Sequence, residues 1–169
     1  MAQNIEIKAK APDFQKSRAL AEQKSDIPAQ VIHQEDIFFH CQDGRLKLRV
    51  FSEDSGELIA YRRADQSGPK SSDYDISSTN DPRGLQKILT RSLGIRGVVR
   101  KKRTLLMAGQ ARIHLDEVEN LGCFLELEVV MKPGQTKAEG EIIAHKLMAE
   151  LEISQDHLLE KAYIDLLEC

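Results

Sequence analysis

Charged side chains recur at every second residue in several short segments of this chain. A β-strand sends successive side chains to opposite faces, so each segment predicts a strand with one charged face and one apolar face. The basic residues on these faces are Lys8, Arg45, Lys47, Arg49, Arg63, Lys101, Arg103 and Arg112. The acidic residues are Glu6, Asp116, Glu126 and Glu128. Such cations bind phosphate oxygens, and closely spaced carboxylates bind divalent metal ions.

The signs of these charges are sorted between the strands. Residues 45–49 carry only cations on the charged face, whereas residues 126–128 carry only carboxylates. One interpretation is an antiparallel sheet with one side in water, which is common and usually mixes the two signs. The other is a sheet curled into a barrel, with helices outside and the charged faces inside. A charged interior costs free energy unless it is neutralised, so the second interpretation predicts a charged ligand.

The charge balance indicates the kind of ligand. The eight cations and four carboxylates would give the interior a net charge near +4. A triphosphate carries about four negative charges near neutral pH, its terminal group titrating near 6. Carboxylates would repel such an anion unless they hold a divalent cation, and Mg²⁺ is bound by carboxylates together with substrate phosphates. The sequence therefore predicts a small-molecule triphosphate as partner and Mg²⁺ or Mn²⁺ as cofactor.

Helices and hairpins are expected around these strands. Strands are predicted over 4–10, 27–39, 44–50, 57–64, 72–76, 97–107, 110–117 and 124–129. Three helices are predicted by their capping residues, which are Asp13, Asp81 before Pro82, and Thr136 with Glu139. A last helix is predicted over roughly 155–167, and its exposed surface could mediate a homodimer. The expected fold is α+β with a mostly antiparallel sheet, in one domain over 1–169.

Composition argues against several other classes of protein. The net charge is −3 and aromatic residues make up 5%, so a nucleic-acid platform with basic strands and stacking rings is not expected. The charged faces contain only Tyr61 and Phe124 as aromatics. The three cysteines include no CxxC pair, which argues against disulfides and structural zinc. No apolar run approaches 18 residues, so we expect a cytoplasmic protein without a membrane segment.

In order along the chain, these segments resemble the motifs of one known family. The segments are Asn4–Lys8, Leu46–Arg49, Val99–Arg103, His114–Asp116, Gly122–Glu128 and Tyr163–Leu167. The first resembles the ExExK motif of the CYTH superfamily, or triphosphate tunnel metalloenzymes. The next four are similar to its second basic strand, its KxR strand and its metal-binding strands. The last resembles the class IV adenylyl-cyclase-like branch.

The resemblance implies an eight-stranded antiparallel β-barrel, or tunnel, with helices packed outside. The phosphate-binding residues that it implies are Lys8, Lys47, Arg49, Arg63, Lys101, Arg103 and Arg112. The metal-binding residues that it implies are Glu6, Asp116, Glu126 and Glu128. Lys8, Arg63 and Lys101 are the candidate catalytic residues. Arg45 has no firm counterpart and is expected at the periphery.

Two departures from the family pattern bear on activity. Asn4 replaces the first glutamate of ExExK, which weakens a second metal position. Arg63 stands where related triphosphatases often carry a lysine, and a guanidinium stays protonated and cannot serve as a base. The resemblance favours a class IV adenylyl cyclase that converts ATP to cyclic AMP and pyrophosphate. A triphosphatase and a non-catalytic polyphosphate- or nucleotide-binding protein remain the alternatives.

Overall fold

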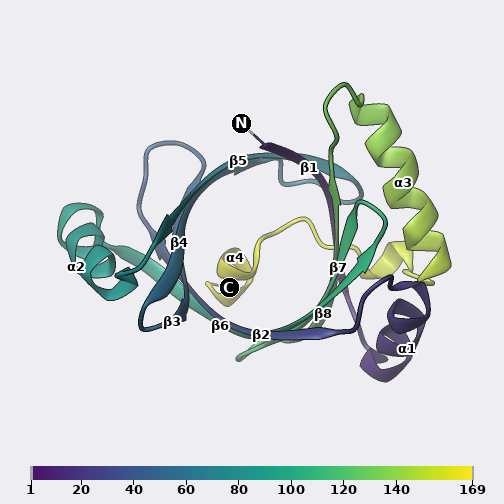
Figure 1. Ribbon diagram of the computed structural model, residues 1–169, viewed down its shortest axis with the longest axis horizontal. Helices are drawn as coiled ribbons and strands as arrows, with labels where there is room; N and C mark the ends of the chain where they lie inside the picture. The colour runs from purple at the N-terminus through teal and green to yellow at the C-terminus, as the bar shows by residue number, and fades with distance from the viewer. Residues whose placement is uncertain (1, 169) are drawn as a thin grey trace.

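Eight antiparallel strands form a closed barrel in the computed structural model, which describes residues 2–168 (Figure 1). Their order around the barrel is β1-β5-β4-β3-β2-β6-β7-β8, and β8 pairs with β1 to close it. The strands are β1 (Ala2–Lys10), β2 (Gln30–Phe39), β3 (Arg45–Ser52), β4 (Ser55–Arg63), β5 (Lys70–Thr79), β6 (Ile95–Ala108), β7 (Ala111–Val118) and β8 (Gly122–Val130). The predicted α+β barrel is therefore confirmed.

Tight turns join most neighbouring strands. The predicted Asp43-Gly44 turn joins β2 to β3, and Gly44 adopts φ 66°, which glycine accepts without strain. Asn120 makes the turn between β7 and β8 with φ 65°, in the region where asparagine is tolerated. Three pairings, β1 with β5, β2 with β6 and β1 with β8, join strands that are distant in sequence. These three pairings convert a set of hairpins into a barrel.

The three capped helices pack against the outside of the barrel. They are α1 (Phe14–Lys24), α2 (Pro82–Leu93) and α3 (Lys137–Glu150) (Figure 1). Asp13, Asp81 and Thr136 accept hydrogen bonds from their first-turn amides, as predicted, and Thr136 forms a complete capping box with Glu139. The largest hydrophobic cluster lies under α1 and α3 and includes Ile7. The apolar faces of the strands thus contact the helices outside the barrel, and the charged faces point into the barrel.

The C-terminal segment differs from the predicted helix over 155–167. It contains a 3₁₀ turn (Gln155–His157), an extended stretch and the short helix α4 (Tyr163–Leu167). The amide of Leu159 donates to the carbonyl of Lys8, and Leu158 forms a bridge with Ala9. Pairing with β1 therefore replaces the hydrogen bonds of the predicted helix. The apolar side chains that led to the helix prediction contact the end of the barrel instead.

The end of the barrel beside Lys8 is covered by this segment. Tyr163 and Ile164 pack with inward-facing apolar residues, including Phe38, Val99 and Phe124. Ile164 fits over Gly97, where a Cβ atom would lie 2.5 Å from its Cδ1. In the view of Figure 1, α4 accordingly lies within the outline of the barrel. The barrel is closed at this end and open at the other.

Two smaller predictions can be compared with the structure. The strand predicted near 72–76 extends over Lys70–Thr79, because β1 pairs with residues 70–74 and β4 pairs with residues 72–79. Cys41 and Cys123 are free thiols, and Cys169 lies outside the described residues. Within residues 2–168, no helix is long and apolar enough to cross a membrane.

Candidate functional site

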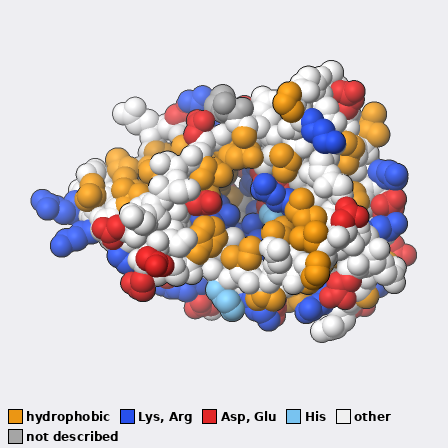
Figure 2. Space-filling model, viewed as in Figure 1, with side chains coloured by type: hydrophobic (Ala, Val, Ile, Leu, Met, Phe, Trp, Pro, Cys, Tyr) orange, Lys and Arg blue, Asp and Glu red, His pale blue; other side chains and the backbone are white. Residues whose placement is uncertain are grey.

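Inward-facing side chains from all eight strands line a cavity of about 260 Å³ inside the barrel. Its lining cations are Lys8, Lys47, Arg49, Arg63, Lys101, Arg103 and Arg112. Its lining carboxylates are Glu6, Asp36, Glu57, Glu126 and Glu128. Figure 2 looks into the open end and shows basic, acidic and histidine side chains inside, with hydrophobic side chains around the opening. The charged strand faces point inward, so the interpretation as a water-covered sheet is wrong.

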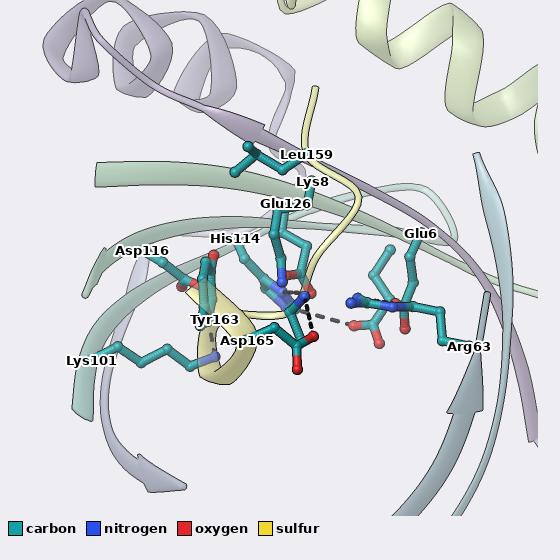
Figure 3. Close-up of polar contacts among 12 residues, drawn as sticks. Glu6, Lys8, Arg63, Lys101, His114, Asp116, Glu126, Leu159, Tyr163 and Asp165 are labelled. Carbon is teal, nitrogen blue, oxygen red and sulfur yellow. Dashed lines mark hydrogen bonds and ion pairs between the residues drawn. The ribbon is translucent and has the colours of Figure 1, made fainter. Parts of the chain in front are cut away.

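The closed end of the cavity is built around Tyr163 from α4. The Tyr163 hydroxyl donates to Asp116 Oδ2 at 2.9 Å, and the Nζ atoms of Lys8 and Lys101 lie 3.9 and 5.0 Å from the centre of its ring (Figure 3). Burial lowers the pKa of Lys101 to about 7 and that of Lys8 to about 8. Two lysines whose charge is costly therefore lie together at this end, where an anion would stabilise their protonated forms.

Asp116 belongs to this basic end of the cavity. Arg103 donates to both of its carboxylate oxygens, at 2.8 and 2.7 Å, and Lys101 lies 3.7 Å away. Although burial opposes ionisation of Asp116, the charges of Arg103 and Lys101 hold its pKa well below the usual range. These contacts leave the carboxylate fully engaged. The prediction that Asp116 binds metal stays a prediction, and its observed contacts position Arg103.

Asp36 organises a second pair of cations, and the sequence reasoning did not single it out. Its carboxylate accepts hydrogen bonds from Lys47 at 2.9 Å and from Arg49 at 2.8 Å. Burial would raise the pKa of Asp36, but the charges of Arg49 and Lys47 hold it well below its usual value. The alternation of side chains along β2 could have revealed it. Asp36 lies on the same strand face as Phe38, and that face lies beside the basic face of β3.

The remaining three predicted metal ligands lie together on β1 and β8. Glu6 lies directly opposite Glu128, and Lys8 lies opposite Glu126. Burial, followed by the charges of Glu126 and Glu128, raises the pKa of Glu6. Adjacent carboxylates that disfavour one another's ionisation are the kind of oxygen site that a divalent cation stabilises.

Protein groups currently balance these three carboxylates. Arg63 Nη1 lies 3.2 Å from Glu6 (Figure 3), Lys8 lies 3.7 Å from Glu126, and Asn4 donates to Glu128 at 2.7 Å. Among residues 2–168, no three histidine, cysteine or acidic side chains already converge as a formed metal site.

Several buried polar atoms around this group lack a partner. Nδ1 of His114 forms no hydrogen bond, although its ring lies 3.8 Å from both Glu126 and Glu128. Nε and Nη2 of Arg63 are also buried without an acceptor. Buried donors without partners are costly, so they indicate groups that a ligand would satisfy. The oxygen-rich carboxylate group therefore fits a hard divalent cation, and the free guanidinium donors fit phosphate.

Two further basic residues lie at the closed end. Arg45 pairs with Asp65 at 3.1 Å and with Asp165 of α4 at 2.7 Å, so it joins the barrel rim to the C-terminal segment. Lys70 is fully buried, and its ammonium donates to the carbonyls of Gln66 and Glu160 at 3.1 and 2.9 Å. Lys70 was missed because the polar sequence around it gives no clear alternation.

A β-barrel that is closed at one end, and is lined by cations and by a group of carboxylates, is typical of a class of phosphate-binding proteins. The family model described as the CYTH domain matches residues 2–163, and the chain belongs to this family. The family implies binding of triphosphate substrates and dependence on a divalent metal. A protein of Methanocaldococcus jannaschii named "Putative adenylate cyclase" is 27% identical over 177 residues, covering 96% of this chain and 97% of the relative.

Solved structures share the fold. The PH1012 protein of Pyrococcus horikoshii has a TM-score of 0.85 at 22% identity, covering 96% of this chain and 98% of its own. A Hippeastrum protein has a TM-score of 0.65 at 14% identity, covering 96% of this chain and 91% of its own. It is described as an adenylyl cyclase candidate that reveals a dominant triphosphatase activity. At these identities the likeness establishes the fold.

Proposed function

We propose that this protein is a metal-dependent enzyme of the class IV adenylyl cyclase type, which converts ATP to cyclic AMP and pyrophosphate. The observation that carries the proposal is the convergence of seven cations in a cavity that is closed at one end. A linear polyanion that enters such a cavity binds end-on, with its terminal phosphate between the cations beside Tyr163. Guanidinium and ammonium groups there hold phosphate oxygens by charge-assisted hydrogen bonds.

The arrangement of charge along the strands favours reaction at the phosphorus atom nearest the open end. Glu6 lies two residues further along β1 from the covered end than Lys8, and Glu128 lies two residues further along β8 than Glu126. A divalent ion held by Glu6, Glu126 and Glu128 would offset charge at the bridging oxygens of the substrate. Because the terminal phosphate lies deepest, these carboxylates lie nearer the α-phosphate. There the ribose 3′-hydroxyl would lose its proton to water, and its oxygen would bond to the α-phosphorus as the bond to the leaving pyrophosphate breaks.

Direct product analysis tests the proposal. ATP and inorganic triphosphate are each incubated with the enzyme and Mg²⁺ or Mn²⁺, and cyclic AMP, pyrophosphate and orthophosphate are measured separately. The expected result is cyclic AMP and pyrophosphate in equal amounts from ATP. Orthophosphate without cyclic AMP would instead favour hydrolysis, and triphosphate binding without any product would leave a non-catalytic binder.

Variants of β3 test whether the basic face binds the phosphates. Lys47→Ala and Arg49→Ala each remove a cation from the cavity wall, so we expect KM for ATP to rise at least tenfold. Lys102→Ala is the matched control, because Lys102 is exposed on the outer face of the barrel and pairs with Glu117. Steady-state kinetics measure the effect. Equal kinetics in the wild type and both cavity variants would contradict phosphate binding at this face.

A triphosphatase is the second candidate, and the deep lysines favour it. Lys8 and Lys101 lie beside the Tyr163 ring at the closed end, so their ammonium groups would stabilise the charge of a terminal phosphate that water attacks there. The triphosphatase activity described for the Hippeastrum structure belongs to this same fold. The product analysis above separates the two reactions.

A further inference from the structure

One buried side chain beside the carboxylate group has no part in the proposed reaction. His114 lies on β7 directly opposite Glu126 of β8, on the same strand face as Arg112, which lines the cavity. Its side chain is 4% exposed. Its Nδ1 lies 3.8 Å from Glu126 Oε1, and its Nε2 lies 3.8 Å from Glu128 Oε2 (Figure 3). The imidazole ring thus lies between two of the proposed metal ligands.

These two separations are too long for hydrogen bonds, because the nitrogen and oxygen atoms of an N–H···O bond lie about 2.7–3.2 Å apart. Among residues 2–168, no group forms a hydrogen bond with the buried Nδ1 atom. Bonds from a metal ion to imidazole nitrogen or carboxylate oxygen are about 2.0–2.2 Å long, so two atoms bound to one ion can lie up to about 4.2 Å apart. The Nδ1 atom and the Glu126 oxygen are therefore too far apart to share a proton but close enough to share an ion.

A purely structural role does not account for this histidine. Buried polar side chains that only support a fold have hydrogen-bond partners, because an unpaired polar atom is costly. Asp116, two residues further along β7, follows this rule, since Arg103 and Tyr163 donate to its carboxylate. The Nδ1 atom of His114 instead faces a carboxylate oxygen that it does not reach.

The second ring nitrogen completes the pattern of a metal-binding histidine. Such a histidine binds the ion through one nitrogen, while the other donates its proton to a carboxylate or carbonyl, which fixes the tautomer. Nε2 of His114 faces Glu128 and can carry the proton. The lone pair of Nδ1 is then directed toward Glu126, and a cation between these two electron-rich atoms would stabilise both.

A nitrogen ligand changes which ion the site prefers. Carboxylate oxygens suit both Mg²⁺ and Mn²⁺, and Mg²⁺ is bound almost entirely by oxygen atoms. Imidazole is a ligand of transition metal ions. A site that combines carboxylates with one imidazole therefore favours Mn²⁺ over Mg²⁺.

We propose that His114 is a ligand of the divalent ion through Nδ1, and that it makes this site prefer Mn²⁺ to Mg²⁺. The inference rests on the metal dependence of the proposed function. It adds a nitrogen ligand to Glu6, Glu126 and Glu128, and it distinguishes two ions that these carboxylates alone would both accept.

Pulsed electron paramagnetic resonance of bound Mn²⁺ tests the nitrogen ligand in the absence of substrate. Electron spin-echo modulation detects a nitrogen nucleus bonded to Mn²⁺, and its frequencies change when the histidines alone are labelled with ¹⁵N. We expect nitrogen modulation in the wild type, a changed pattern in the labelled wild type, and loss of the modulation in His114→Gln. His145→Gln is the matched control, because His145 is exposed on α3, and it should keep the modulation. The labelled wild type provides the test even if His114→Gln does not fold.

Metal titrations test the ion preference. His114→Gln should weaken Mn²⁺ binding about tenfold and Mg²⁺ binding by less than about threefold, because Mg²⁺ gains little from a nitrogen ligand. Bound Mn²⁺ without modulation from histidine nitrogen, or modulation that persists in His114→Gln, would overturn the inference while leaving the carboxylate site intact. An equal loss of both ions in His114→Gln would overturn the preference for Mn²⁺. Failure of the wild type to bind either ion would overturn the metal dependence of the proposed function itself.

Discussion

Lys101 shows how strongly the cavity modifies an ordinary side chain. Its burial, with the nearby charge of Arg103, lowers its pKa to about 7, whereas a lysine in water titrates near 10.4. The protonated form predominates below pH 7, and the neutral form predominates above it. A bound triphosphate favours the protonated form, so its affinity must fall as pH rises through the pKa of the free enzyme.

We therefore expect the affinity for inorganic imidotriphosphate to decrease about tenfold between pH 6.5 and pH 8. The terminal phosphate titrates near 6 and changes its own charge little over most of this range. Lys101→Arg, which stays protonated, should flatten the dependence. Calorimetry at a series of pH values measures it. An identical slope in Lys101→Arg would show that another group controls binding.

Asn4 is the residue that would most clearly limit the proposed metal site. It is 1% exposed and its amide donates to Glu128, so a glutamate there would add a fourth carboxylate beside three others. Without metal, we expect Asn4→Glu to lower the free energy of unfolding by about 1–3 kcal/mol, through loss of the hydrogen bond and like-charge repulsion.

With Mn²⁺ the same variant should recover, because the added carboxylate can bind the ion. Thermal unfolding with EDTA and with Mn²⁺ measures both effects, and Asn4→Gln keeps a neutral amide as the matched control. If Mn²⁺ raised the Tm of Asn4→Glu no more than that of the wild type, position 4 would lie outside the reach of the metal.

Among the helices and strands, the features that depend on nearby residues could be predicted from the sequence. The capping residues Asp13, Asp81 and Thr136 marked three helix starts correctly, because a cap is decided within four residues. Strict alternation likewise identified the charged faces of β1, β3, β6 and β8. These faces supplied most of the cavity wall.

The elements that were predicted incompletely depend on distant partners. The strand predicted over 72–76 extends over Lys70–Thr79, because β1 pairs with its first part and β4 with the rest. The apolar residues of the C-terminal segment fitted a helical period, but their contacts are with β1 and the barrel end. Lys70 was missed for the same reason, since only the closed barrel brings Glu160 to it. The partners of Asp36 lie across the β2–β3 hairpin, so local alternation could have revealed it.

The C-terminal segment provides a prediction at this scale. The Lys70 ammonium donates to carbonyls of both Gln66 and Glu160, so Lys70→Met would leave buried acceptors without a donor. Each such group costs about 1–3 kcal/mol. We expect faster hydrogen exchange at the amide of Leu159, whose bond to Lys8 depends on the docked segment.

Lys102→Met is the control for loss of a lysine, because Lys102 is exposed and its ion pair with Glu117 lies on the outer surface. Exchange measured by mass spectrometry over residues 158–167 distinguishes local release from global destabilisation. Unchanged exchange in Lys70→Met would show that Lys70 does not hold the segment in place.

For the molecule as a whole, the interior charge is better balanced than the sequence predicted. Arg45 lies at the rim, and Asp36 and Glu57 join the lining, which then holds seven cations and five carboxylates. One divalent ion would raise the net charge of the lining from +2 to about +4, close to the opposite charge of a triphosphate. Metal and triphosphate should therefore bind cooperatively, each offsetting charge that the other introduces.

Coupling free energies between sites are typically about 1–3 kcal/mol, so Mg²⁺ should raise the affinity for imidotriphosphate by about tenfold or more. Calorimetry with Mg²⁺ and with EDTA measures this, after correction for the complex that the ion forms with the ligand in solution. Glu126→Gln removes one carboxylate from the group and should reduce the coupling, whereas Lys102→Gln on the outer face should not. Reciprocity requires the ligand to strengthen Mn²⁺ binding by a similar factor. Equal affinities with and without the ion would place metal and triphosphate in separate sites, and the carboxylates would then serve only to hold the lysines and arginines in position.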